Sequence, residues 1–456
     1  MPADKPLRVR DPVHGFIPYT REEGALIDTP PLQRLRTITQ LAFTSLVYPG
    51  ATHSRFEHSL GVMHIAGRIA DRVKLSVPER RLVRLAALLH DIGHLPFSHA
   101  GEAALAGLMP EMAKLSEEAH ERFTVALIEH DADIHRVLHK EKDRRAVLDI
   151  LDKGSRPRLR RPLDPILSQI VSGPLDADKL DYLLRDSLMA GVKYGIFDLE
   201  RMIDAFVPHG QRGDRNLAVW REDVACIDQY VLARYYMTLQ VYRHQVRRIS
   251  DAMLKEAVLC AVHLRGRRAT RLGRFFTSMP FDPHWHSDFL LTTDASLLAD
   301  LICLPANTRS GTLARRLHDR RLLKQVFECK IKDIPESGAA WREDLVKDVA
   351  KQEALAKRFA KALRVTPGLI LVDIRQLGNP LYRDPGLSLE EDIRVVDRSG
   401  RDERLGDISE SLSQKVKVEA EADLYVYVPA DGHSAGARKR MGRTIRKVLA
   451  TTAREG

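Results

Sequence analysis

Hydrophobic residues recur at helical spacing through most of the first three hundred positions of the chain. One such series is Leu32, Leu35, Ile38 and Leu41, whose intervals of three place the side chains along one face of a helix. Residues 28–30, with the sequence Asp-Thr-Pro, precede this series and combine capping residues with a first-turn proline. They predict that a helix begins there.

The same spacing predicts further helices along the chain. Residues 56–66 form one and residues 82–91 another, and the second of these ends in a Gly- and Pro-containing turn. Additional helical stretches are expected at 118–130, 176–190, 223–265 and 311–328.

Strand-like alternation of apolar and polar residues is confined to residues 369–374 and 424–428. We therefore expect a mainly α fold, with an all-helical core over residues 1–310. A smaller C-terminal mixed α/β region, which includes a basic tail, is expected over residues 311–456.

The charge balance favours anionic partners. Lys and Arg number 72 and Asp and Glu 62, a net charge of +10, which suits nucleotides or nucleic acid. Basic residues concentrate in the loop at residues 153–162 and in the tail at residues 438–447 (RKRMGRTIRK). Each segment is either an anion-binding surface or simply solvated.

Several classes of protein are not supported. The cysteines are far apart and form no CxxC pair, which argues against a disulfide framework and a thiolate zinc site. The N-terminus has no apolar core of a signal peptide, and no apolar run approaches the roughly 18 residues of a membrane span. We expect a soluble cytoplasmic protein. The four cysteines are Cys226, Cys260, Cys303 and Cys329.

Metal chemistry is the main hypothesis from the residues themselves. Of 18 histidines, ten lie between residues 53 and 139. His58, the adjacent His90 and Asp91, and the distant Asp178 supply a mixed set of nitrogen and oxygen ligands. Such donors suit a borderline or hard divalent cation, with Mn, Fe, Mg and Zn as candidates. Four protein ligands leave room for water or a phosphate oxygen.

A His-Asp dipeptide alone is a weak signal, because the chain also has one at residues 130–131 and one at residues 318–319, both in polar surroundings. The pair at residues 90–91 differs because it ends the apolar segment LVRLAALLHDIGH. A buried carboxylate without a partner is costly, and a cation would remove that cost. A structural His–Asp hydrogen bond is the alternative.

Three more histidines, His94, His99 and His120, are near enough in sequence to join this site. His94 follows His90 by four residues, so a helical turn would place both on one side. Such histidines could bind phosphate oxygens or donate a proton to a leaving group. Each one taken alone could equally be a structural histidine.

Five motifs in a fixed order give a specific resemblance. The chain resembles the HD-domain deoxynucleoside triphosphate triphosphohydrolases, in the branch of the sterile-alpha-motif and HD-domain protein and its bacterial relatives. The resemblance is strong over residues 9–260 and faint beyond residue 330. The motifs are DPxHG, DTPxxQRLRxIxQL, YPGATHSRFEHSLGV, HDxGHxPFSH and DxDKxDYxxRD.

The resemblance implies a role for each matching residue. It implies metal ligation by the four residues named above and catalytic roles for the three histidines, with His99 as the candidate general acid. It also implies attack of water at the α-phosphorus, giving a deoxynucleoside and inorganic triphosphate. The remaining implied contacts are Arg55, Lys179 and Arg234 with the triphosphate, Tyr182 and Asp186 with the sugar 3′-hydroxyl, Gln40 and Leu41 beside the sugar and base, and Tyr242 against the sugar.

The resemblance further implies a homo-oligomer and a second site for an activating nucleotide, which would use Asp28, Gln33 and Arg36. The chain departs from the pattern at Arg10, where the close relative carries Asn, and at Arg243, which replaces a Gln beside the base. Nucleotide activation and base preference, including a dGTPase-like preference, therefore stay open.

Three functions follow from the sequence. The first is metal-dependent hydrolysis of deoxynucleoside triphosphates. The second is an HD phosphohydrolase acting on another nucleotide, such as a nucleoside monophosphate or a cyclic nucleotide. The third is a nucleic-acid-binding or nucleotide-sensing protein with little catalysis, which the basic segments would serve.

Overall fold

The structure is a computed structural model, and it describes most of the chain. The described ranges are 7–108, 119–151, 163–264, 271–277, 285–334, 339–377, 393–408 and 421–455. The basic loop predicted at residues 153–162 lies outside them.

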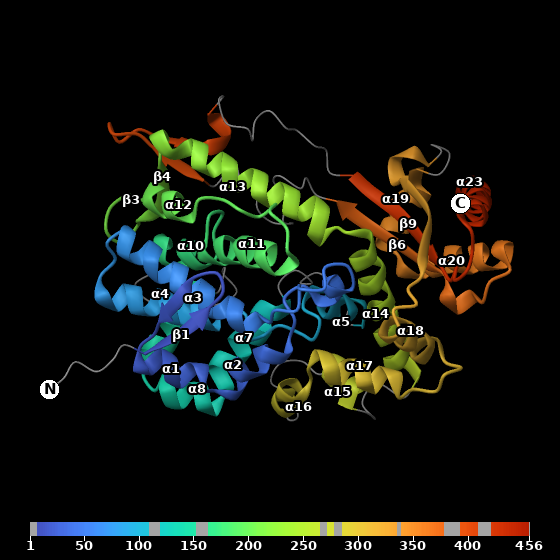
Figure 1. The fold of residues 1–456 in the computed structure, drawn as a ribbon, viewed down its shortest axis with the longest axis horizontal. Coiled ribbons are helices and arrows are strands. Elements are labelled where there is room, and N and C mark those ends of the chain that lie inside the picture. The colour runs from blue at the N-terminus through green and yellow to red at the C-terminus, as the bar shows by residue number, and fades with distance from the viewer. Residues whose placement is uncertain are drawn as a thin grey trace.

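Helices dominate the fold, which confirms the predicted mainly α class (Figure 1). No described helix combines the length and the apolar character needed to cross a membrane. The helices before the C-terminal sheet are α1 (Arg21–Ile27), α2 (Pro30–Arg34), α3 (Arg55–Arg72), α4 (Val77–Leu89), α5 (His99–Leu108), α7 (Ala119–His130), α8 (Ala132–Val137), α9 (Glu141–Leu151), α10 (Pro165–Val171), α11 (Ala177–Ala190), α12 (Leu199–Ala205), α13 (Val224–Met237), α14 (Gln245–Leu264), α15 (Arg271–Thr277), α16 (Trp285–Leu291), α17 (Asp294–Ile302) and α18 (Arg309–His318).

Helix α3 is the centre of the helical part and packs against both α4 and α11. It begins with a capping box, in which Ser54 accepts from the backbone of the first turn and Glu57 accepts from the backbone N–H of Ser54. Its buried residues, such as Val62, Met63 and Ile65, join a large core whose members are almost fully excluded from solvent. This packing brings the faces of three helices together around one point.

Two hairpins interrupt the helical part where no strands are predicted. Strands β1 (Arg8–Asp11) and β2 (Gly15–Pro18) pair with each other, and β3 (Phe206–His209) pairs with β4 (Asn216–Trp220). With only four or five residues each, these strands are too short for alternation to reveal them.

The C-terminal region is mixed α/β, as predicted. An antiparallel sheet in the order β5-β9-β6 contains β5 (Lys324–Lys330), β6 (Leu371–Leu377) and β9 (Glu421–Val428), so both predicted strand segments overlap strands. Its helices are α19 (Ala339–Lys347), α20 (Val349–Leu363) and α23 (Ala435–Glu455). Figure 1 shows them gathered at one end of the molecule.

Strands β7 (Arg394–Val396) and β8 (Asp402–Arg404) leave that region and join the helical part. Strand β7 pairs in parallel with β4, giving a sheet in the order β3-β4-β7-β8. The division of the chain at residue 310 stays a prediction. The pairing of β7 with β4 shows that segments on either side of that position share one sheet.

Two of the helix predictions are wrong in extent. The helix predicted through residue 41 ends at Arg34, because the chain then turns and becomes extended to pair Thr39 with Ser54. The helix predicted at 311–328 ends at His318, where Arg320 has a left-handed backbone (φ 53°) and β5 follows. The segment 223–265 is helical but is divided between α13 and α14 by the π-helical turn η4 (Thr238–Tyr242).

Candidate metal centre and catalytic pocket

The four predicted metal ligands come from three helices. His58 lies on α3, His90 and Asp91 follow the last residue of α4, and Asp178 lies in the first turn of α11. Helix α11 starts at this point because Asp176 caps it, accepting the backbone N–H of Lys179 at 2.7 Å.

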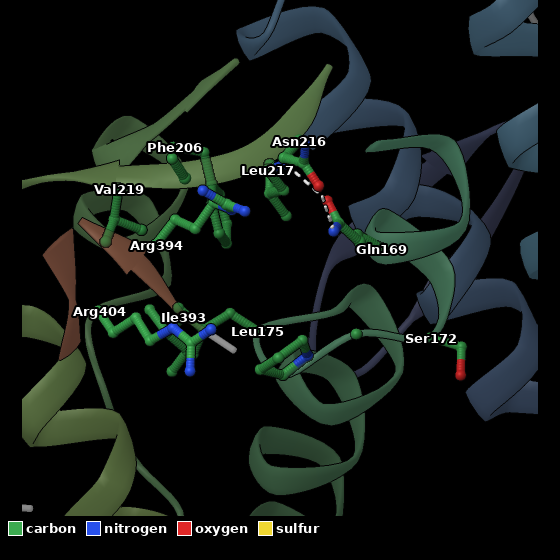
Figure 2. Close-up of a pocket in the computed structure, with 13 residues that line it drawn as sticks. Gln169, Ser172, Leu175, Phe206, Asn216, Leu217, Val219, Ile393, Arg394 and Arg404 are labelled. Carbon is green, nitrogen blue, oxygen red and sulfur yellow. Dashed lines mark hydrogen bonds between the residues drawn. The ribbon is translucent and has the colours of Figure 1, made fainter. Parts of the chain in front are cut away.

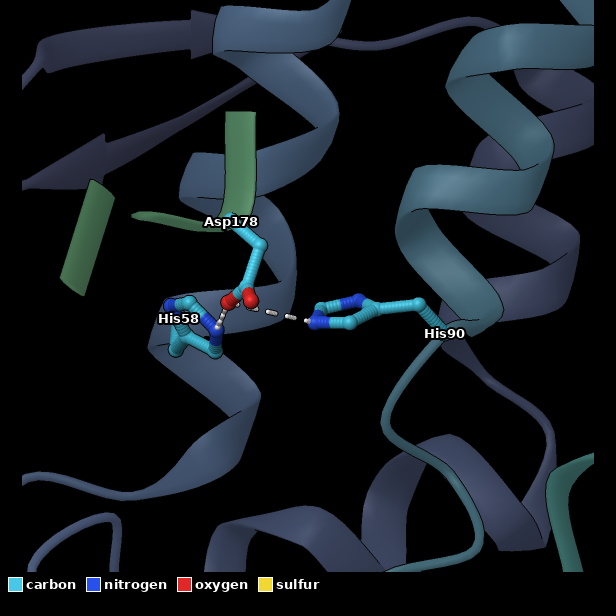
Figure 3. Close-up of side chains that lie close together, drawn as sticks. All are labelled: His58, His90 and Asp178. Carbon is cyan, nitrogen blue, oxygen red and sulfur yellow. Dashed lines mark hydrogen bonds and ion pairs between the residues drawn. The ribbon is translucent and has the colours of Figure 1, made fainter. Parts of the chain in front are cut away.

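These four side chains converge. Nε2 of His58 lies 2.9 Å from Oδ1 of Asp178 and 3.8 Å from Oδ2 of Asp91. Nε2 of His90 lies 3.1 Å from Oδ1 of Asp91 and 3.8 Å from Oδ1 of Asp178. Figure 3 shows the carboxylate of Asp178 between the two imidazole rings. The donor atoms therefore surround one small volume, as a shared cation requires.

Hydrogen bonds orient each imidazole so that its Nε2 faces this volume. Nδ1 of His90 donates to the carbonyl oxygen of Ala87 at 2.8 Å, which leaves the lone pair on Nε2. That Nε2 is buried and has no hydrogen-bond partner among the described residues. Nδ1 of His58 is 2.8 Å from Asp181 Oδ2, the arrangement that orients a metal-bound histidine. A divalent cation fits this set because it would supply the missing partner of His90.

The electrostatics also favour a cation. Burial opposes ionisation of Asp91, but Arg55, His90 and His94 hold its pKa well below the usual range. Burial likewise opposes ionisation of Asp178, but the hydrogen bond from His58 and the nearby imidazole of His90 hold its pKa well below the usual range. Burial alone would lower the pKa of His58, whereas its hydrogen bonds to Asp178 and Asp181 raise it to about 10. A cation would therefore meet two ionised carboxylates and displace a proton from His58.

Asp181 is a positioning residue that the sequence analysis missed. It is fully buried and accepts from His58, from His14 Nε2 at 2.6 Å, and from Arg185 at 2.8 and 2.9 Å. Arg185 in turn donates to Asp11 at 2.8 Å. The first and last motifs of the resemblance thus meet behind His58, and the i, i+4 spacing of Asp181 and Arg185 was the available signal.

Glu102 organises the three predicted catalytic histidines and was also missed. Its carboxylate is buried and lies 2.8 Å from Nδ1 of His94, 3.2 Å from Nδ1 of His120 and 3.0 Å from Nδ1 of His99. The rings of His94 and His120 stack with centroids 4.0 Å apart. His94 is not placed by a helical turn, because α4 ends at Leu89; a tight turn carries it toward Asp91, whose Oδ1 is 3.2 Å from its Nε2.

The three histidines differ in exposure and charge. Burial, Arg55 and His120 lower the pKa of His94 to about 4, so its ring is neutral. Burial would lower the pKa of His120 too, but Glu102 raises it. The His99 side chain is 61% exposed, whereas those of His94 and His120 are 2% and 16% exposed. Asp91, His94 and His120 also form a second group with ligand-type atoms within 4.8 Å of one another.

A second cluster holds the residues predicted beside the sugar. Asp186 accepts from the hydroxyl of Tyr242 at 2.8 Å and lies 2.7 Å from Nε2 of His53, which the sequence analysis did not single out. Tyr182 packs edge-on to Tyr242, with ring centroids 6.1 Å apart, and is 6.5 Å from the ring of His58. Tyr182 therefore bridges this cluster and the metal centre.

The predicted neighbours of the sugar and base are buried beside that cluster. The backbone N–H of Gln40 donates to the carbonyl of His53 at 3.0 Å. Leu41 follows it and is 4% exposed. Oε1 of Gln40 is buried without a hydrogen-bond partner in the described part of the chain.

The predicted triphosphate contacts lie within the protein interior. Nη1 of Arg55 is 2.5 Å from Asp91 Oδ2, and its Nε donates to Ser98 at 2.8 Å. Lys179 donates to Asp176 at 2.7 Å, and Arg234 is buried. Arg55 thus directly touches a predicted metal ligand.

The three residues predicted for an activating nucleotide lie apart from this pocket, around α1 and α2. Gln33 donates to the carbonyl of Ile27 at 2.7 Å and accepts from Arg36 at 2.8 Å, while Arg36 also covers the ring of Phe56. Asp28 is exposed and is the C-cap of α1. The next residue, Thr29, is the N-cap of α2.

Comparison with known proteins places these features in a family context. Residues 55–183 match the family described as HD domain, and residues 197–277 match that described as HD associated region. All four predicted metal ligands fall in the first match.

Individual relatives cover part of the chain. An uncharacterized protein of Methanocaldococcus jannaschii is 36% identical over 55% of this chain and 49% of its own length. The deoxynucleoside triphosphate triphosphohydrolase SAMHD1 homolog of Dictyostelium discoideum is 31% identical over 55% of this chain and 48% of its own length. The chain thus spans about half the length of these curated relatives.

One solved structure covers nearly the whole chain. A hypothetical protein from Aquifex aeolicus, 26% identical, superposes with a TM-score of 0.68 over 97% of this chain and all of its own. The fold, including the C-terminal region, therefore recurs in another protein.

Proposed function

We propose that this chain, in which residues 55–183 match the HD domain, is a metal-dependent phosphohydrolase that converts deoxynucleoside triphosphates to deoxynucleosides and inorganic triphosphate. The observation that carries the proposal is the convergence of His58, His90, Asp91 and Asp178 on one volume. A similarity to proteins named deoxynucleoside triphosphate triphosphohydrolase supports the choice of substrate.

The four ligands would hold the cation and keep it beside the α-phosphate. When bound, a divalent cation supplies Lewis-acid chemistry, because it polarises a phosphoryl oxygen and lowers the pKa of water. Arg55 fixes one oxygen of Asp91 through its ion pair. It would also offer guanidinium hydrogen bonds to the triphosphate, together with Lys179 and Arg234.

Glu102 and the three histidines around it would supply a proton and stabilise negative charge at the bond that breaks. Glu102 raises the pKa of His120, which favours its protonated form, and a protonated His120 would stabilise the charge that develops on the phosphate. His99 is our candidate general acid at the departing 5′-oxygen: its side chain is exposed to an incoming substrate, and Glu102 holds its Nδ1. The neutral His94 would accept or relay hydrogen bonds between Asp91 and Glu102, which its two ring nitrogens face.

The Tyr182–Tyr242–Asp186 cluster would hold the deoxyribose. Tyr182 and Asp186 would hold the 3′-hydroxyl and Tyr242, whose hydroxyl donates to Asp186, would pack against the sugar, while the apolar Leu41 would disfavour a ribose 2′-hydroxyl. Such a site discriminates against ribose because the 2′-hydroxyl would have no hydrogen-bond partner beside Leu41.

The direct test is product analysis. The full chain is incubated with each dNTP and Mn²⁺ or Mg²⁺, with and without GTP or dGTP, and the phosphorus products are separated by anion-exchange chromatography. Inorganic triphosphate with an equimolar deoxynucleoside is the expected result. Release of orthophosphate or pyrophosphate instead, or turnover of only monophosphates or cyclic nucleotides, would refute the proposed reaction. Stimulation by GTP or dGTP would support the activating site at Asp28, Gln33 and Arg36, and sedimentation under the same conditions would test for the proposed homo-oligomer.

A second candidate function, nucleic-acid binding, is favoured by one observation. Helix α23 carries six basic residues in ten positions, and none has a carboxylate within ion-pairing distance among the described residues. The helix packs against β5 and α20, so the basic side is displayed from a fixed platform. Such a surface neutralises phosphates without reading sequence.

Fluorescence anisotropy with single- and double-stranded DNA at several salt concentrations tests this candidate. Exchanging Arg443 and Lys447 together for Gln should reduce the salt slope by about two, whereas Arg136→Gln, an exposed arginine on α8, should leave it unchanged. Binding that is independent of salt would exclude this function.

A further inference from the structure

A cavity of about 350 Å³ lies between α10, β4 and the β7–β8 hairpin, and none of its lining residues is a predicted metal ligand. Its apolar walls are buried residues from four separate segments: Leu175, Phe206, Val219 and Ile393. Figure 2 shows the open space between the residues of β3 and β4 on one side and Leu175 and Ile393 on the other. This volume is in the lower range of pockets that hold small molecules.

Two exposed arginines border this cavity on neighbouring strands. Arg394 and Arg404 are directly opposite in the register of β7 and β8, and both line the cavity. Side chains directly opposite on antiparallel strands lie on the same face, about 5 Å apart at Cβ, and like charges in that position are destabilising. The two guanidinium groups are labelled in Figure 2.

Carboxylates compensate this charge only in part. Asp402 is two residues before Arg404 on β8, shares its face, and forms an ion pair with Arg394. The same Asp402 also lies 3.5 Å from Nε2 of His209. Glu403 points to the other face, where it pairs with Arg221 and Arg401. Arg404 therefore has no carboxylate partner in the described part of the chain.

The amide side chains of the wall, Gln169 and Asn216, are already engaged. Gln169 donates to Asn216 Oδ1 at 3.0 Å and accepts the backbone N–H of Leu217 at 2.7 Å, which ties α10 to β4. These bonds keep the wall rigid and leave the arginines as the groups that would recognise a ligand.

We propose that this cavity is a second ligand site, which binds a small organic phosphate with an apolar or aromatic part. The phosphate would bridge Arg394 and Arg404, since a guanidinium pair matches its geometry and charge. The organic part would lie against Leu175, Phe206 and Val219. No metal takes part in this recognition.

The site is separate from the catalytic pocket, although the two adjoin through one loop. The loop at residues 172–175 forms the cavity floor, and Gly173 donates its backbone N–H to Asp176 at 2.9 Å, the cap of α11. A methyl group on Gly173 would lie 2.5 Å from the carbonyl oxygen of Gln169, so the loop is closely packed. The cavity lining and the predicted metal ligands have no residue in common, so each can be changed without replacing a residue of the other.

Isothermal titration calorimetry of the full chain with phenyl phosphate and with inorganic phosphate tests the proposal. Phenyl phosphate should bind with one site per chain and more tightly than inorganic phosphate. Arg404→Gln should weaken binding about tenfold or more, because a charged hydrogen bond is lost. Arg401→Gln, an exposed arginine on the same hairpin but outside the cavity, should change the affinity by less than about threefold, within the range of exposed ion pairs.

Asp178→Ala distinguishes this cavity from the catalytic pocket. It should leave phenyl phosphate binding intact, and thermal melts confirm that each variant is folded. The proposal is overturned if phenyl phosphate does not saturate, if it binds no better than inorganic phosphate, if Arg404→Gln has no larger effect than Arg401→Gln, or if Asp178→Ala abolishes the binding.

Discussion

Metal binding to this chain should release a proton from His58, and this gives a quantitative prediction. In the metal-free site the hydrogen bonds to Asp178 and Asp181 outweigh burial and raise the pKa of His58 to about 10. The cation requires the neutral imidazole, so its affinity should rise with pH throughout the range below that pKa. Asp91 and Asp178 are already ionised, because their pKa values are held well below the usual range, and they contribute no proton.

The magnitude follows from the fraction of neutral His58. Between about pH 6.5 and about pH 8.5 this fraction rises roughly 100-fold, so the Kd for Mn²⁺ should fall roughly 100-fold, or about 2.7 kcal/mol. An unperturbed histidine, with a pKa of about 6.5, would be almost fully neutral above about pH 7.5 and would give a flat profile there.

Isothermal titration calorimetry under anaerobic conditions measures both quantities. The Kd comes from titrations across the pH range, and the proton count comes from buffers with different ionisation enthalpies. About one proton should be released per Mn²⁺ near pH 7.5. A Kd that is constant above about pH 7.5, with no proton release, would refute the argument for His58.

Three further predictions concern the residues around the metal centre. Asp178→Ala should abolish measurable Mn²⁺ binding and lower dNTP turnover by at least about 10³-fold. The control Asp319→Ala, at an exposed His-Asp pair, should leave both quantities unchanged. Wild-type turnover in Asp178→Ala would contradict the ligand set. Glu102→Gln should lower kcat about 10- to 100-fold and change the Mn²⁺ affinity by less than about threefold. The reason is that Glu102 contacts the three histidines and none of the four predicted ligands. A parallel loss of Mn²⁺ affinity would place Glu102 in the metal site instead. Leu41→Gly should raise activity on ATP relative to dATP, measured as the ratio of kcat/KM values, because it opens space beside C2′; an unchanged ratio would exclude that placement of Leu41.

The sequence was informative where residues are ordered in motifs. The mainly helical class followed from apolar residues at helical spacing, and the convergence of four ligands followed from the apolar context of the His90–Asp91 pair and from the ordered motifs. A charged pair at the end of an apolar helix must be drawn inward, and the structure places Asp91 at 3% exposure.

The missed residues share a physical reason. Glu102 occupies the first turns of a helix, where an acidic residue reads as an exposed complement to the helix dipole. It is buried because His94 and His120, from two other segments, meet it beside His99 of its own helix, and spacing along one helix does not reveal the first two contacts. The β4–β7 pairing joins residues more than 170 positions apart through strands of three to five residues, which carry too little periodicity to be recognised.

The most direct test of the metal centre is a crystal of the full chain soaked with Mn²⁺ and measured for anomalous scattering. A single strong peak within about 2.0–2.3 Å of Nε2 of His58, Nε2 of His90 and one oxygen each of Asp91 and Asp178 is the result that this account predicts. A fully occupied Mn²⁺ elsewhere, with these four side chains still joined only to one another, would contradict it.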